Sequence, residues 1–351
     1  MTQLYYAMTM PGAETLAYSE IHARLPKAEL VKFARGVVLF RVPAAARELL
    51  KLRTVEDVFL ALAHITGLGR QGRDALRVLH SATLHADVAN AIDTWSRFHH
   101  SKPPITWRVV SQKEGSHEFR RMDAGQAVTD ALRHVLPRHM RQVKDDADIE
   151  FWLWLHGSEA VVGLRLSDAE MRHRHYKRAH LPASLRPTVA AAMSWLASPT
   201  DQDIVLDPLC GAGTLIIERA LMAPLQRALG GDIQPSAVAH ARRNATAASI
   251  TADWRVWDAR SLPLDIASVT RILTNLPFGK QIGTHEENLQ LYATLAQEFQ
   301  RVLSADGSLV TLTSEDQLWD MTLKDHGWKV TKKVVIVILG QPASIFVARK
   351  A

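Results

Sequence analysis

Hydrophobic positions in the first part of the chain recur with two different periods. Short, mostly apolar stretches at 4–10 and 36–42 are typical of strands. Apolar residues at 14–25 and 46–63 instead recur every three or four positions, as they do on one face of a helix. We therefore predict the order strand, helix, strand, helix, which makes residues 1–60 a small α+β unit.

A second unit is predicted over residues 61–167. Helical spacing returns at 87–98 and 123–136, and the stretch at 105–112 is typical of an extended strand. The apolar stretches 148–157 and 159–166 lie almost end to end and are rich in aromatic and β-branched residues. Together they predict a β-hairpin.

The composition changes at residue 168. Cations and histidines crowd the stretch 168–187, which also holds Tyr176, and two prolines prevent it from being one helix. We interpret residues 168–190 as a basic linker that either contacts a phosphate backbone or is a solvated charged face. A metal site is not expected, because the histidines lack carboxylate or cysteine partners at suitable spacing. The candidate RNA contacts are Arg172, Arg174, Lys177, Arg178 and Arg186, with Lys280 further along the chain.

From residue 191 onward, strands and helices alternate regularly. The helix 188–197 is followed by strands at 203–207, 229–233, 253–259, 271–275, 307–314, 328–339 and 343–349. Helical segments separate the earlier strands, and a short turn joins the last two. This order predicts a mostly parallel, seven-stranded sheet with a terminal hairpin, the plan of a class I, Rossmann-like methyltransferase, over residues 191–351.

Length, charge and cysteine count narrow the class of protein. The 351 residues are enough for two or three units with their own cores, and the formal charge of +6 favours an anionic partner such as nucleic acid. The apolar run at 334–339 is too short to cross a bilayer, so we expect a cytoplasmic protein without a membrane partner. The single cysteine, Cys210, excludes an internal disulfide and a cysteine-rich zinc module.

A glycine-containing loop follows the first strand of the seven-stranded unit. Asp207 ends this strand, Gly211 and Gly213 follow, and a helix begins near Thr214. Glycines at such a turn let the backbone approach a ligand closely because no Cβ intervenes. Two glycines are weak evidence by themselves, since any mononucleotide fold or a tight structural turn would also explain them.

Three successive strands each end in an aspartate, and these acids identify the ligand more closely. Asp207 can bind the amino group of a methionine moiety, Asp232 can accept hydrogen bonds from ribose hydroxyls, and Asp258 can accept one from an adenine amine. Each aspartate taken singly could equally be a helix cap or a turn residue. Together they favour S-adenosylmethionine over a nicotinamide dinucleotide, whose pyrophosphate Asp207 would repel.

The fourth strand of this unit ends in the run Asn275, Leu276, Pro277, Phe278 and Gly279. The nitrogen of an exocyclic amine on a base is a weak nucleophile, and two acceptors that bind its hydrogens can orient its lone pair. The Asn275 side chain and the Leu276 carbonyl are suited to this, Pro277 stiffens the backbone, and Phe278 offers a stacking face. The alternative is an ordinary turn with a core phenylalanine.

These motifs resemble those of a known family. The segments 207–214 and 274–283, with 49–63 and 181–193, are similar to THUMP-domain RNA methyltransferases that form N2-methylguanosine in tRNA. The resemblance spans the chain and implies a ferredoxin-like domain, a THUMP domain that docks the tRNA, and a catalytic domain. In close relatives the target is the sixth nucleotide, in the acceptor stem. Leu276 replaces the more usual proline, and Gln281 stands where many relatives carry arginine.

The sequence thus predicts an S-adenosylmethionine-dependent tRNA (guanine-N2)-methyltransferase that needs no obligate protein partner. An adenine-N6 enzyme acting on rRNA or DNA remains an alternative, as does an inactive RNA-binding module. No base that could activate Cys210 is evident, so a nucleophilic role is rejected. The resemblance adds Leu185 to the predicted cofactor-binding residues, which are Leu185, Asp207, Cys210, Gly211, Gly213, Thr214, Asp232, Ile233, Asp258, Ala259 and Asn275.

Overall fold

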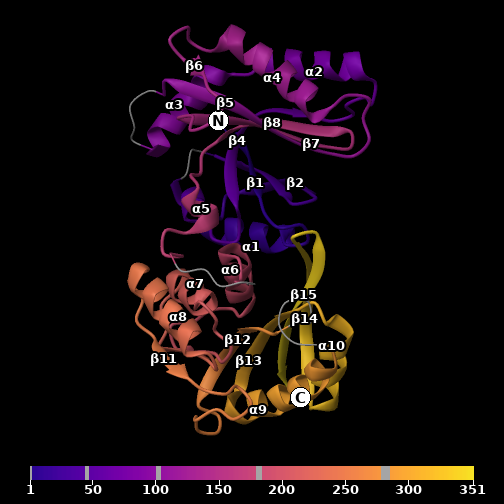
Figure 1. Ribbon diagram of the computed structural model, residues 1–351. Helices are drawn as coiled ribbons and strands as arrows, with labels where there is room; N and C mark the ends of the chain where they lie inside the picture. The colour runs from indigo at the N-terminus through magenta and orange to yellow at the C-terminus, as the bar shows by residue number, and fades with distance from the viewer. Residues whose placement is uncertain (1, 44–46, 100–103, 179–183, 278–284) are drawn as a thin grey trace.

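The computed structural model describes residues 2–43, 47–99, 104–178, 184–277 and 285–351. Two β-sheets, each with its own helices, make up the molecule, and the short helix α5 (Glu170–His173) lies on the chain between them (Figure 1). The predicted linker is thus partly helical, and helix α6 (Pro187–Leu196) already begins inside it.

The amino-terminal sheet has eight strands in the order β2-β3-β1-β4-β8-β7-β5-β6. The predicted strands, the β7–β8 hairpin and all but one of the predicted helices are present, and β2, α2 and β6 are additional elements that the sequence pattern did not predict. The elements are β1 (Gln3–Met8), α1 (Glu14–Arg24), β2 (Glu29–Ala34), β3 (Val37–Val42), the 3-10 helix η1 (Arg47–Lys51), β4 (Asp57–Ile65), α2 (Gly72–Leu84), α3 (Val88–His99), β5 (Thr106–Glu114), α4 (Arg121–Val135), β6 (Arg141–Gln142), β7 (Ile149–His156) and β8 (Glu159–Arg165).

The helix predicted over 46–63 is wrong. This stretch is η1 followed by strand β4, which pairs antiparallel with β1 on one side and β8 on the other. A central strand that is buried on both faces lacks the alternation of apolar and polar residues seen in a half-exposed strand. The consecutive apolar residues Val58, Phe59 and Leu60 therefore also fit the apolar spacing of a helix. The expected boundary between residues 60 and 61 therefore falls inside β4, and the two expected amino-terminal units share one sheet.

The carboxyl-terminal sheet has the predicted seven strands, in the order β11-β10-β9-β12-β13-β15-β14. Pairing is parallel from β11 to β13 and antiparallel at β13–β15 and β14–β15, as expected for a terminal hairpin. The remaining elements are β9 (Ile204–Asp207), α7 (Thr214–Met222), β10 (Arg227–Asp232), α8 (Pro235–Ala247), β11 (Asp253–Val256), β12 (Val269–Asn275), α9 (His285–Val302), β13 (Leu303–Thr313), α10 (Asp316–Asp325), β14 (Trp328–Ile338) and β15 (Gln341–Lys350).

The strand order places a topological switch point between β9 and β12. From β9 the chain moves outward through β10 to β11, and it then returns to β12 on the opposite side of β9. Helices that follow such strands leave a crevice at the carboxyl ends, where open α/β sheets bind their ligands. Asp207 at the end of β9 and Asn275 at the end of β12 thus face the same crevice region.

The two sheets are held against each other by the β14–β15 hairpin and by α6. Figure 1 shows the hairpin reaching from the carboxyl-terminal sheet toward the amino-terminal unit. The amide of Val337 donates a 2.9 Å hydrogen bond to the carbonyl of Pro11, and a Cβ on Gly12 would lie 2.0 Å from the Val335 carbonyl oxygen. The Trp195 indole on α6 also donates to the Ser19 hydroxyl at 3.0 Å.

Candidate active site

A cavity of about 520 Å³ opens at the switch point. Segments far apart in the sequence supply its wall: the chain before α6, the loop after β9, the ends of β10, β11 and β12, and helix α9. Its lining residues are Ser184, Leu185, Asp207, Leu209, Cys210, Gly211, Ala212, Thr214, Leu215, Asp232, Ile233, Gln234, Ala237, Asp258, Ala259, Arg260, Asn275, Leu276, Pro277 and Leu291. All the predicted cofactor-binding residues except Gly213 are in this wall.

Gly213 serves the loop in a different way. It has a left-handed φ of 81° at the start of α7, and a Cβ there would lie 2.8 Å from the Trp254 ring and 3.0 Å from the Ala241 Cβ. It therefore allows the loop to pack on α8 and β11, behind the cavity wall. Gly211 is also left-handed, with a φ of 49°, but nothing lies within 4 Å of its Cβ position, so it leaves the ligand side of the loop open.

Asp207 is a buried carboxyl group at the end of β9, only 2% exposed. Burial, with a smaller contribution from the charge of Asp232, raises the pKa of Asp207 to about 7, although the Leu209 amide donates to its Oδ1 at 3.2 Å. A buried carboxylate is costly unless a cation or hydrogen-bond donors compensate it. The site is therefore suited to a ligand that brings a cationic group to Asp207.

Asp232 fixes the glycine loop to the end of β10. Its Oδ2 accepts a 3.0 Å hydrogen bond from the Gly211 amide, and its Oδ1 accepts one of 2.9 Å from the Gln234 amide. The amide of Cys210 also donates to the Gly231 carbonyl at 2.8 Å. A carboxylate has about four lone-pair sites, so Asp232 can still accept from hydroxyl groups in the cavity.

Asp258 is already paired with a cation that the sequence analysis did not single out. The Arg260 guanidinium contacts both carboxylate oxygens, at 3.0 and 2.6 Å, and these hydrogen bonds lower the pKa of Asp258. Both side chains are partly exposed at the rim of the cavity. The expected hydrogen bond from an adenine amine would therefore compete with Arg260 or share Asp258 with it.

Trp257 is a second residue that sequence reasoning missed. Its ring packs on Gly231, where a Cβ would lie 2.0 Å from a ring carbon, and its Nε1 donates to the Pro208 carbonyl at 3.2 Å. It thereby joins the loop after β9 to the end of β10. The adjacent glycines 230 and 231 could have suggested this contact, since paired glycines inside a strand indicate close packing by a neighbour.

The strand-end motif is anchored on both sides of Leu276. The Leu276 amide donates to the Leu312 carbonyl on β13 at 3.0 Å, and the Tyr292 hydroxyl on α9 donates to the Pro277 carbonyl at 2.7 Å. The Asn275 side-chain oxygen is buried and has no hydrogen-bond partner among the described residues. Buried polar atoms normally have partners, so this one is available to a donor on a ligand. Phe278 and Lys280 lie outside the described residues.

The donor set fits S-adenosylmethionine. A buried carboxylate suits its methionine amino group, a second carboxylate can accept from a ribose, and apolar residues such as Ile233 and Ala259 complete the wall. No group of three or more potential metal ligands occurs among the described residues. Burial raises the pKa of the Cys210 thiol well above its usual range, which agrees with its predicted lack of a nucleophilic role.

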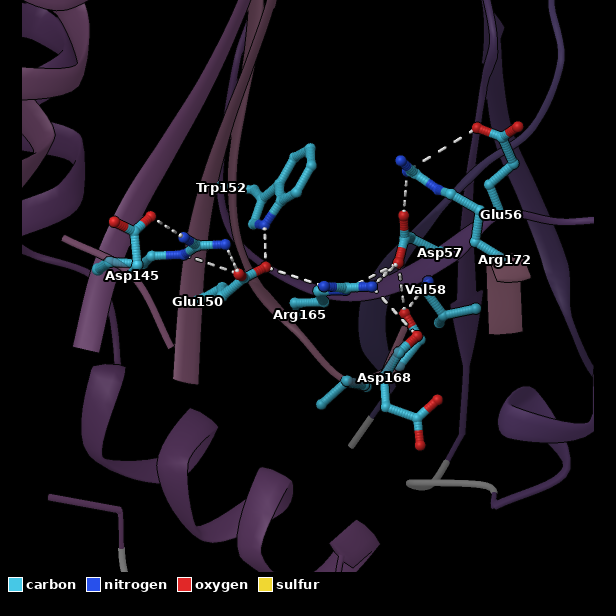
Figure 2. A network of polar contacts seen from close by, with 12 residues as sticks. Glu56, Asp57, Val58, Asp145, Glu150, Trp152, Arg165, Asp168 and Arg172 are labelled. Atoms are coloured by element: carbon cyan, nitrogen blue, oxygen red, sulfur yellow. Dashed lines mark hydrogen bonds and ion pairs between the residues drawn. The ribbon is translucent and has the colours of Figure 1, made fainter. Parts of the chain in front are cut away.

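Most of the predicted RNA-binding cations form ion pairs or hydrogen bonds with other groups of the chain. Arg172 contacts Asp57 and Glu56 at the base of β4, next to the Asp57–Arg165 pair (Figure 2). Arg186 likewise reaches Glu56, at 3.2 Å.

The Arg174 side chain is only 8% exposed and Lys177 is buried, so neither is placed at the surface as an RNA contact would be. Arg174 pairs with Glu218, and the Lys177 ammonium donates to the Leu185 carbonyl. The acidic partner of Arg174 lies far away in the sequence, so the sequence pattern alone could not show this pairing. Only Arg178 in this segment is exposed without an ion pair to another described residue.

Among the described helices, none combines the length and the apolar character that a membrane span needs.

Residues 174–341 match a family model described as "RMKL-like, methyltransferase domain". Over 219 residues the chain is 32% identical to tRNA (guanine(6)-N(2))-methyltransferase THUMP3 of Bos taurus, which covers 58% of this chain and 43% of that protein. The chain thus spans less than half the length of this relative.

Two bacterial comparisons cover nearly the whole chain. A tRNA (guanine(6)-N2)-methyltransferase of Thermus thermophilus is 29% identical over 318 residues, 88% of each protein. The crystal structure of TrmN from Thermus thermophilus matches the fold with a TM-score of 0.83 and 27% identity over 100% of both chains. The match to this solved structure therefore extends over both the amino-terminal and the carboxyl-terminal sheet.

Proposed function

We propose that this chain transfers a methyl group from S-adenosylmethionine to the N2 amine of a guanosine in tRNA, and the match of residues 174–341 to a methyltransferase-domain model supports this. The observation that carries the proposal is the buried side-chain oxygen of Asn275, which has no hydrogen-bond partner within the described part of the chain and shares a cavity wall with Asp207 and Asp232. The Thermus thermophilus relative, named for guanine 6 of tRNA and matched over 88% of both proteins, supports the acceptor stem as the target.

Asn275 and Leu276 would hold the amine. The Asn275 side-chain oxygen and the Leu276 carbonyl can each accept one N–H hydrogen, which leaves the nitrogen lone pair directed along a fixed line. The Leu276 carbonyl belongs to the peptide between the two anchors described above, the Leu276 amide on Leu312 and the Pro277 carbonyl on Tyr292. These anchors fix its direction before substrate arrives, so little reorganisation is needed.

S-adenosylmethionine, when bound, supplies an electrophilic methyl group on a positively charged sulfur. Asp207 would hold its amino group, and Asp232 would hold its ribose hydroxyls. The acceptors at Asn275 and Leu276 also stabilise the positive charge that develops on the amine nitrogen as it is alkylated. The methylated amine is then strongly acidic and loses a proton to water or a nearby acceptor.

We further propose that the amino-terminal unit is a THUMP-type docking unit for tRNA and that the protein is cytoplasmic. The net charge of +6 supports a polyanionic partner. The match to the Thermus thermophilus relative extends over both units of this chain, which supports a tRNA substrate for this chain as well. The single cysteine is consistent with a reducing compartment.

Incubation with two otherwise identical tRNA transcripts tests the proposal. One transcript carries guanosine at the sixth nucleotide and the other carries inosine, which lacks the exocyclic amine. With S-adenosylmethionine, nucleoside mass spectrometry should find N2-methylguanosine in the first transcript and no methylated nucleoside in the second. N6-methyladenosine in both would establish the adenine alternative. The absence of any thermal shift with S-adenosylhomocysteine would indicate an inactive RNA-binding module.

A further inference from the structure

A fully buried carboxylate, Glu218 on α7, binds polar side chains from two other parts of the chain. From the amino-terminal unit, the Arg53 guanidinium binds it through two nitrogens, at 2.8 and 2.9 Å. From the segment before α6, Arg174 donates to it at 3.0 Å and the Tyr176 hydroxyl at 2.7 Å. We call these four residues the Glu218 hub.

The hub is fixed firmly to the amino-terminal unit. The backbone amide of Arg53 donates to both oxygens of Glu20, another fully buried carboxylate, on α1. Arg174 also donates to the Arg53 carbonyl at 2.8 Å. Two guanidinium groups and one hydroxyl satisfy the buried Glu218 carboxylate, so loss of any one of them leaves this charge incompletely compensated.

The hub is equally close to the cofactor cavity. Glu218 lies one helical turn beyond Thr214 and Leu215, which line the cavity at the start of α7. Directly after Tyr176, the buried ammonium of Lys177 donates to the Leu185 carbonyl, and Leu185 lines the same cavity together with Ser184. The Glu218 hub, with Lys177 next to it in the chain, therefore contacts both the helix after the glycine loop and the segment that holds Leu185.

We propose that Lys177 and the Glu218 hub are positioning residues for cofactor binding. Through them the amino-terminal unit fixes the position of Ser184 and Leu185 in the cavity wall. This inference rests on the proposed function, because it assumes that the cavity holds S-adenosylmethionine. None of the hub residues lines the cavity, so their effect on the ligand acts through Leu185 and α7. Arg53 gives the sharpest test of this inference, because it belongs to the amino-terminal unit, which is expected only to dock RNA.

Calorimetric titration of the full chain with S-adenosylhomocysteine tests the inference. Lys177→Met keeps the aliphatic stem and removes the ammonium, and we expect the Kd to rise about tenfold. Arg53→Gln should raise the Kd by roughly threefold to tenfold, and Arg53→Lys, which keeps a charged donor, by less. Arg227→Gln is the matched control, because Arg227 pairs with Asp253 at the surface, and its Kd should stay within about twofold of the wild-type value.

Two further readouts separate positioning from general damage. In methyl-transfer assays, KM for S-adenosylmethionine should rise in Lys177→Met while kcat at saturating cofactor stays within about twofold, since Asn275 is untouched. Amide hydrogen exchange at 184–186 should accelerate in the ligand-free variant. Unchanged Kd and exchange in both Lys177→Met and Arg53→Gln would overturn the inference. Wild-type protein that fails to bind S-adenosylhomocysteine would instead contradict the proposed function, while the exchange measurement would still test the link to Leu185.

Discussion

The hydroxyl of Tyr292 on α9 donates a 2.7 Å hydrogen bond to the carbonyl of Pro277, just beyond the end of β12. The same hydroxyl lies 2.9 Å from Thr313 Oγ1 on β13. Burial raises the pKa of Tyr292, so the hydroxyl remains a neutral donor at any physiological pH. A residue on a helix therefore fixes the backbone of the motif that would hold the substrate amine.

Tyr292→Phe should lower kcat about tenfold, because the Leu276 carbonyl loses one of the two anchors that direct it. The Kd for S-adenosylhomocysteine should remain within about twofold. Tyr18→Phe is the matched control, since its hydroxyl donates to a backbone carbonyl, that of Ala28, in the amino-terminal unit. Steady-state kinetics and calorimetry would decide. Equal losses of kcat in both variants would mean that Tyr292 acts only on general stability.

Asn275→Ala should abolish most turnover while cofactor binding persists. The side-chain oxygen is placed to accept an amine hydrogen, whereas the carboxylates Asp207 and Asp232 remain in place to bind the cofactor. A fall in kcat of about a hundredfold or more is expected, with S-adenosylhomocysteine affinity nearly unchanged. Asn90→Ala, at an exposed position on α3, provides the control. Normal turnover in Asn275→Ala would remove this residue from the mechanism.

Cofactor affinity should depend on pH through Asp207. Its pKa of about 7 means that the carboxylate needed to bind an ammonium group is mostly protonated at pH 6 and mostly ionised at pH 8. The Kd for S-adenosylhomocysteine should therefore be about tenfold higher at pH 6 than at pH 8. Asp207→Asn should bind weakly at both values. A flat Kd in the wild-type protein would show that Asp207 does not bind the ligand's cation.

The same carboxyl group should make the ligand-free protein less stable as the pH rises. Burial raises the pKa of Asp207 from 3.8 to about 7, so between these values the native state holds a proton that the unfolded chain has lost. Its contribution to the free energy of unfolding is complete below pH 4 and is lost as the pH approaches 7. At pH 8, Asp207→Asn should be more stable than the wild type, by on the order of 3 kcal/mol in urea denaturation. A less stable variant would contradict this assignment.

Two glycines of one loop should respond differently to alanine. Gly213→Ala should lower the free energy of unfolding by about 2 kcal/mol or more, because its Cβ meets Trp254 and its φ is left-handed. Gly211→Ala has open space at its Cβ position, so it should cost about 1 kcal/mol and instead weaken S-adenosylhomocysteine binding. Denaturant titration and calorimetry on both variants test this. The reverse order of effects would show that the two roles are exchanged.

Arg178 should contribute to RNA affinity without affecting the fold. It is exposed and forms no ion pair with the other described residues, unlike Arg174. Arg178→Ala should weaken tRNA binding uniformly across sequences and reduce the salt dependence of log K by about one charge. Filter binding at several salt concentrations gives both quantities, with Arg227→Ala as the surface control. An unchanged salt dependence would show that Arg178 does not contact the RNA backbone.

The sequence by itself determined the carboxyl-terminal sheet and the location of the site. Strands that alternate with helices have few right-handed arrangements available, and their carboxyl ends must meet at one edge. For this reason Asp207, Asp232, Asp258 and Asn275 could be placed near one another without coordinates. Their residue types were also informative, since successive acidic strand ends have few structural explanations when they occur together.

Only the tertiary structure decided which charges are free and how the amino-terminal strands pair. Arg172 and Arg174 formed a convincing basic segment, yet their partners Asp57 and Glu218 lie far away in the sequence. The local pattern of β4 predicts a helix, because a strand paired on both sides and buried over Asp57–Leu60 lacks polar alternation there. Local periodicity carries information about one face of one element, whereas ion pairing and burial on two faces depend on residues brought together by folding.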